Sequence, residues 1–198
     1  MDLKDLLYSH ISGSIPGQGS LLIADPMMHG DFFSRSVIII LDLPEKGGEL
    51  GLVLNKETHL TLKDLIPDWE EGIKVPVFSG GPVDMDRLFL LHTLKDVFPD
   101  AMEVCPGIYV GGNVDDIINY INSGGEVEGK MRFFLGYSGW APNQLQREIE
   151  RHSWAVNPSP SGEDLLNGEG MEYWRREVEQ LGSDYRSWLM VPPDPSYN

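Results

Sequence analysis

The residues closest to a chemical motif are Gly136-Tyr137-Ser138-Gly139-Trp140. A nucleophilic serine of the elbow type stands on a sharp strand-to-helix turn between glycines. An apolar run precedes this segment and a helical pattern follows it, so a turn is predicted there. The second glycine of G-x-S-x-G would stand at position 140, where the chain has Trp140, and His152 is the only histidine after Ser138. A structural turn is therefore favoured over a hydrolase, with Ser138 as the one candidate nucleophile.

The same corner is the candidate site for a small anion. Helix N-termini attract anions because their first N–H groups are unpaired. Residues 129–152 contain four Lys and Arg against two Glu, which makes this stretch locally positive in an acidic chain. Asp25 and Arg35 also flank an apolar loop that could frame a pocket. The candidate ligand-binding residues are Arg35, Ser36, Gly136, Ser138, Gly139, Trp140 and Gln144.

Two further patterns are weaker. Gly80-Gly81-Pro82 resembles a phosphate loop but lacks its Lys and Ser/Thr, and Asp84 and Asp86 follow directly, so it is interpreted as a turn. Asp84 and Asp86 with His92 could ligate a metal, yet none of the five histidines forms an H-x-H or H-x-x-x-H pair. The sequence therefore predicts no metal and no cofactor.

Composition narrows the function classes. The 198 residues carry 15 Lys and Arg against 31 Asp and Glu, a formal charge of −16, which argues against electrostatic binding to nucleic acid or an anionic membrane. Cys105 is the single cysteine, so a disulfide framework is excluded and a packed thiol is expected. The longest aliphatic run, Val37–Leu41, is too short to cross a bilayer, and no signal peptide is evident. A cytoplasmic protein is predicted.

The elements that must position these residues are read from apolar patterns and turn residues. They alternate irregularly, which favours an α+β fold with a largely antiparallel sheet that curls into a small barrel. A β-hairpin is expected from the second and third strands, and residues 1–198 are expected to form one domain with a C-terminal helical extension at about 171–182. The predicted strands are 21–24, 36–42, 49–55, 75–79, 87–93, 108–110, 131–135 and 153–156. The predicted helices are 3–10, a short one between Thr61 and Pro67, 114–123, 142–151 and 171–181.

Several of these segments together resemble the AlgH/YqgE family of bacterial proteins. The resemblance spans roughly residues 15 to 156, with Asn143 where the family usually has glycine. It implies a small closed β-barrel flanked by helices, and it implies little chemistry, because no catalytic reaction is established for the family. The segments are Leu22–Pro26, Phe33–Ile38, Leu50–Lys56, Gly80–Val83, Leu91-His92, Leu135–Pro142, Gln144-Leu145 and Trp154.

The sequence thus favours a non-catalytic regulatory protein that acts through a protein partner or a small anionic ligand. Two alternatives stay open. Some family members are named as transcriptional regulators, although Arg175-Arg176 is the only adjacent basic pair here. The other alternative is a serine hydrolase that uses Ser138.

Overall fold

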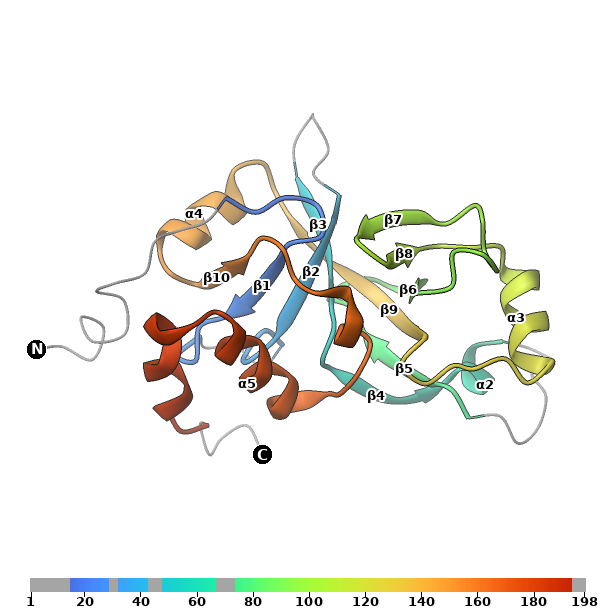
Figure 1. Ribbon diagram of the computed structural model, residues 1–198. Coiled ribbons are helices and arrows are strands. Elements are labelled where there is room, and N and C mark those ends of the chain that lie inside the picture. The colour runs from blue at the N-terminus through green and yellow to red at the C-terminus, as the bar shows by residue number, and fades with distance from the viewer. Residues whose placement is uncertain (1–14, 29–31, 43–47, 67–73, 194–198) are drawn as a thin grey trace, which may run out of the picture.

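The computed structural model describes residues 15–28, 32–42, 48–66 and 74–193 (Figure 1). The helix predicted at 3–10 lies outside these ranges. The strands are β1 Leu21–Ala24, β2 Val37–Asp42, β3 Glu49–Val53, β4 Glu57–Thr61, β5 Pro76–Ser79, β6 Val83–His92, β7 Met102–Cys105, β8 Ile108–Val110, β9 Met131–Trp140 and β10 Trp154–Asn157. The α-helices are α2 Leu62–Leu65, α3 Val114–Asn122, α4 Gln144–Glu150 and α5 Gly170–Gln180, and two 3₁₀ helices are η1 Gly162–Asp164 and η2 Ser183–Met190.

The strands form one curled sheet, and the fold is α+β as predicted. Pairing runs in the order β10-β1-β2-β3-β9-β6-β8-β7, with β4 and β5 attached beside β9. All described pairs are antiparallel except β5 with β9, and β2 and β3 form the expected hairpin. The sheet is a half-barrel, because this path of paired strands ends at β10 and at β7.

The strand β2 is buried on both faces, which explains its unbroken apolar sequence. Val37 and Ile39 pack into a cluster with Trp174 of α5. Ile38 and Ile40 pack on the opposite face with residues of α4. All four side chains are fully buried, so β2 forms the centre of the core between these two helices.

The ten-residue strand β9 corrects the predicted turn at Gly136–Trp140. The strand continues to Trp140, and β3 pairs with this second half, Leu50 opposite Gly139 and Gly51 opposite Ser138. Gly136 and Gly81 permit a close approach of two backbone segments instead of a turn: a Cβ on Gly81 would clash with the Tyr137 carbonyl and the Ser138 amide. Gly136, at φ 69°, lies directly against the backbone of Val83 and Met85 in β6.

Smaller differences have local causes. β4, with the polar sequence Glu-Thr-His-Leu-Thr, was not predicted because it is an edge strand with little apolar alternation. β7 and η2 were also missed. The helix α4 begins at Gln144 rather than Pro142, because Asn143 is left-handed at φ 61°, a conformation that suits the glycine usual in the family. Val114, which has the same helical spacing as the buried Ile117 and Ile121 of α3, is 60% exposed.

Candidate functional site

Ser138 is not placed as a nucleophile. It lies within β9 and is 1% exposed, and its hydroxyl donates to the Gly80 carbonyl at 3.2 Å. A nucleophile elbow needs an exposed serine between a strand and a helix, and that arrangement is missing here. Through this hydrogen bond, Ser138 instead links β9 to the segment that connects β5 and β6.

The corner around Trp140 already contains a carboxylate. The indole N–H groups of Trp140 and Trp154 donate to one oxygen of Glu148 at 2.9 and 2.8 Å, and Gln144 donates to the other at 2.8 Å. The Gln144 side-chain oxygen accepts from the Ala141 amide at 3.0 Å. The donors expected to hold an anion are thus directed to neighbouring protein groups. Anion binding here stays a prediction to which this geometry lends no support.

The other predicted residues lie in separate surroundings. The guanidinium of Arg35 donates to the carbonyls of Val191 and Pro192 and stacks over Trp174 at 4.6 Å, and Ser36 donates to the Phe33 carbonyl. Burial lowers the pKa of Arg35.

The candidate metal ligands are also dissimilar in their surroundings. Asp84 and Asp86 are exposed on β6, whereas His92 is fully buried near Phe98 and Tyr109. Within the described ranges, no three His, Cys, Asp or Glu side chains are grouped so that they could hold a metal ion.

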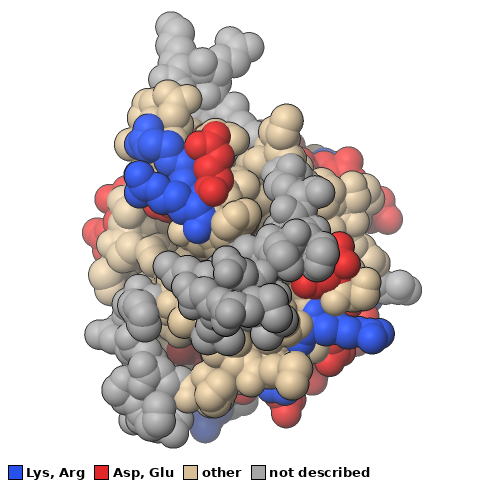
Figure 2. All heavy atoms as spheres, turned by 90° about the vertical axis from the view of Figure 1, so that its left-hand side faces the viewer, with Lys and Arg blue, Asp and Glu red and all other residues tan. Residues whose placement is uncertain are grey.

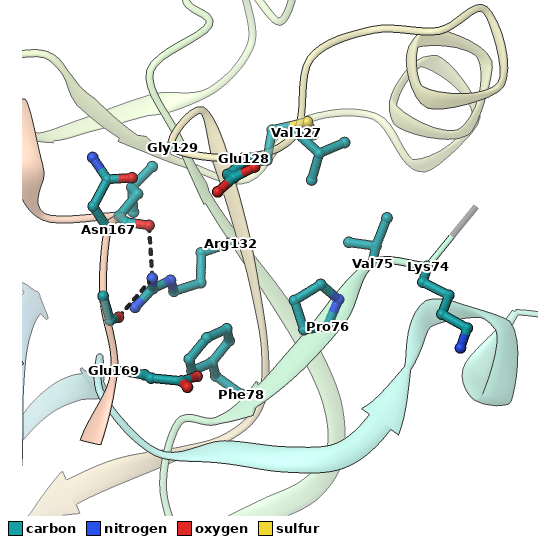
Figure 3. A pocket seen from close by; sticks show the side chains of 13 residues that line it. Lys74, Val75, Pro76, Phe78, Val127, Glu128, Gly129, Arg132, Asn167 and Glu169 are labelled. Atoms are coloured by element: carbon teal, nitrogen blue, oxygen red, sulfur yellow. Dashed lines mark hydrogen bonds between the residues drawn. The ribbon is translucent and has the colours of Figure 1, made fainter. Parts of the chain in front are cut away.

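A pocket of about 530 Å³ lies elsewhere, and none of the predicted ligand-binding residues lines it (Figure 3). Three segments meet there: the start of β5, residues 127–132 leading into β9, and residues 166–169 leading into α5. Its wall combines apolar and charged side chains, a combination typical of ligand sites. We call it the Arg132 groove. The side chains labelled in Figure 3 belong to Lys74, Val75, Pro76, Phe78, Val127, Glu128, Arg132, Asn167 and Glu169.

Arg132 holds the three segments together. It is 6% exposed, and its guanidinium donates to the carbonyls of Leu54 at 2.7 Å, Leu166 at 2.6 Å and Gly168 at 2.9 Å. The same group stacks on the Phe78 ring at 4.1 Å. Burial lowers its pKa, but a guanidinium remains protonated in proteins, so the positive charge is retained.

Asn55 fixes the entry to α5 and with it Glu169. The buried Asn55 side chain donates to the carbonyls of Arg35 and Gly170 and accepts from the Val37 amide, and the Gly170 amide donates to the Asn55 carbonyl at 2.8 Å. Glu169 stands at the N-cap of α5 but makes no capping bond with its side chain. The pKa of the Glu57 carboxyl on β4 is raised, first by a hydrogen bond with Glu169 and then by burial.

Sequence reasoning did not identify the Arg132 groove. Arg132 interrupts the apolar run Met131–Leu135, and a charged residue inside a buried strand is a signal, because such a residue must find internal partners. Glu169 and Asn55 gave no comparable signal.

The chain matches the family model described as AlgH-like over residues 21–186. A UPF0301 protein of Parabacteroides distasonis is 40% identical over 185 residues, covering 93% of this chain and 92% of its own. One from Bacteroides thetaiotaomicron is 36% identical over 195 residues, with 98% of both chains covered.

Solved structures have the same fold. A protein of Corynebacterium diphtheriae superposes with a TM-score of 0.75 at 22% identity, covering 95% of this chain and 98% of that one. The AlgH protein from Pseudomonas aeruginosa gives 0.67 at 25% identity, covering 93% and 99%. In the described parts of the present chain, no helix has the length and apolarity needed to cross a membrane.

Proposed function

The chain belongs to the AlgH-like family, and from this premise we propose that it is a non-catalytic regulatory protein that acts by binding a small ligand in the Arg132 groove. The observation that carries the proposal is the groove itself. Three chain segments distant in sequence meet around one buried cation, and they leave about 530 Å³ between apolar and charged walls. A ligand that fills this space touches all three segments at once. Its binding would therefore change how firmly α5 is attached to the sheet.

The absence of catalysis is supported by Ser138. A serine that is 1% exposed within a strand cannot reach a substrate carbonyl without a change of the backbone. A serine-directed phosphonate probe tests the alternative: labelling of the folded protein that is lost in Ser138→Ala would favour a hydrolase.

Direct DNA binding has little electrostatic support. The chain carries −16, and Figure 2 shows one face on which the Lys and Arg of the described residues form small separate groups beside Asp and Glu. A DNA-binding face normally carries a continuous basic patch.

A cytoplasmic location is part of the proposal and is supported by the single buried, unpaired thiol of Cys105.

The experiment is a fragment screen by ligand-observed NMR with a variant that obstructs the groove. Pro76 lines the groove and is exposed, so Pro76→Trp should fill space without disturbing the core. Met102→Trp is the matched control, because Met102 is 68% exposed on a strand outside the groove. We expect hits that bind the wild type and the control but not Pro76→Trp. If every hit binds Pro76→Trp as tightly as it binds the wild type, or if no fragment binds, the proposal is refuted.

A further inference from the structure

Large apolar side chains that face solvent are concentrated in one part of the fold. Among the described residues nine such side chains are exposed, and six of them fall between positions 83 and 114. Met85 on β6 is 65% exposed, and Val114 at the start of α3 is 60% exposed. Large contiguous apolar patches are rare on soluble monomers, and those that occur often mark interaction sites. The six residues are Val83, Met85, Leu88, Val97, Met102 and Val114.

The first half of β6 is poorly covered by the rest of the fold. All six residues from Val83 to Leu88 are exposed. β9 pairs with the first and the last of these six, and the residues between them form a bulge. No described strand pairs with the other edge of this half, because β8 reaches only Leu91 and His92. This half of β6 therefore presents both its side chains and one edge to solvent.

The start of α3 and the turn after β6 adjoin this exposed half. Leu90 packs in one cluster with Phe98 of that turn and with Ile117 of α3. The Gly111 amide, which lies just before α3, donates to the Leu90 carbonyl at 3.0 Å. Leu88 is two residues from Leu90 in a regularly paired part of β6, so both lie on the same face. Figure 1 shows these elements together on the right-hand side, away from α4 and α5. We call this surface the β6–α3 face and define it by Met85, Leu88, Val97 and Val114.

The surroundings of the β6–α3 face are acidic. Residues 81–128, which include β6, β7, β8 and α3, hold nine Asp and Glu against two Lys and Arg, a net charge of −7. The other 150 residues of the chain carry −9. All nine acidic residues are exposed. Asp84 and Asp86 flank Met85, and two aspartates directly follow Val114. Acidic and apolar side chains are therefore interspersed on one surface.

This combination selects the chemistry of the partner. Potentials across an interface are complementary, and like charges facing each other cost free energy. A second copy of the chain would bring another acidic face against this one, and a nucleic acid would bring phosphates. A segment with apolar side chains on one side and Lys or Arg around them satisfies both features of the surface.

We propose that the β6–α3 face docks a basic, amphipathic segment of a partner protein. The apolar side chains of the partner cover the exposed apolar residues of the face, and its Lys and Arg lie beside the surrounding carboxylates. None of the four residues that define the face lines the Arg132 groove, so this inference is independent of the proposed function.

The test uses three synthetic peptides of equal length as probes. One is an amphipathic helix of lysine and leucine, the second has glutamate in place of lysine, and the third has serine in place of leucine. Each is titrated into the ¹⁵N-labelled protein, and the shifts of the Met85 and Val114 amides are followed. We expect only the lysine–leucine peptide to bind there, with an affinity that falls as the salt concentration is raised.

Matched variants locate the contact. Met85→Ser should weaken the lysine–leucine peptide about fivefold, whereas Met190→Ser, at a position of η2 that is 84% exposed, should leave its affinity unchanged. The double variant Asp84→Asn with Asp86→Asn should weaken it about threefold. Glu172→Gln with Glu179→Gln removes the same charge from exposed positions of α5 and should have a smaller effect.

Every other outcome overturns the proposal. Equal binding of the glutamate–leucine peptide would remove the role of charge, and equal binding of the lysine–serine peptide would remove the role of the apolar residues. No binding of the lysine–leucine peptide, or an unchanged affinity in Met85→Ser, would show that the face does not dock such a segment. A dimer in sedimentation velocity that Met85→Ser dissociates would assign the face to a second copy of the chain. Fragment binding in the Arg132 groove is measured separately, so the proposed function stands or fails on its own.

Discussion

Replacing Arg132 with alanine should destabilise the protein strongly, because this one side chain of β9 contacts Leu54 just after β3, Phe78 of β5 and the entry to α5. The guanidinium donates to three carbonyls. Hydrogen bonds to charged groups contribute about 1.5–3 kcal/mol each, so three independent bonds would amount to about 5–9 kcal/mol. The groove admits water to part of this site, which restores some of the loss. We therefore expect Arg132→Ala to lower the free energy of unfolding by about 3–5 kcal/mol.

The assay is urea denaturation followed by far-ultraviolet circular dichroism. Arg147→Ala is the control, since Arg147 is exposed on α4, and it should change stability by less than about 0.5 kcal/mol. Arg132→Lys keeps the charge but cannot reach three carbonyls, so its loss should be intermediate. Hydrogen exchange should also become faster at residues 166–169. A loss below about 1 kcal/mol in Arg132→Ala would refute the reasoning that this cation holds the three segments together.

Three further predictions concern other parts of the fold. Gly81→Ala should prevent soluble folding because its Cβ would clash with the Tyr137 backbone, whereas Gly107→Ala, with an open position at φ 80°, should cost only about 1 kcal/mol in urea denaturation. Burial raises the pKa of Cys105 to about 11, so a thiol reagent at about pH 8 should react at least a hundredfold faster with the unfolded chain than with the native one. Burial also raises the pKa of Glu177, so its native state favours the protonated form and stability falls as pH rises. Glu177→Gln should therefore melt at a higher temperature than the wild type at about pH 7, and this advantage should vanish below about pH 4.

Local sequence patterns predicted the parts of the fold that local physics controls. Val37–Leu41 is apolar at every position because both of its faces are covered, and this can be read without knowing the partners. The predicted helix at 114–123 is α3, and the spacing of Ile117 and Ile121 agrees with their burial on one face of it. The hairpin of β2 and β3 follows from two apolar runs around a glycine-rich connection.

The remaining features depend on contacts between distant residues. Gly136 indicated a turn, yet its role depends on Gly81 and the start of β6, which lie close against β9 at this point. The groove depends on Arg132 meeting the Leu54 carbonyl, 78 positions away. No local pattern encodes which carbonyl a buried cation will reach, so the sequence could signal that Arg132 needs partners but not where they lie.

The most direct test of the central claim is the affinity of the fragment hits for the wild type and for Pro76→Trp, measured by the shifts of the Gly129 and Gly168 amides. The account predicts saturable binding to the wild type, with a loss of at least about tenfold in Pro76→Trp and no loss in Met102→Trp. Equal affinity in all three proteins would contradict it, because the fragments would then bind outside the Arg132 groove.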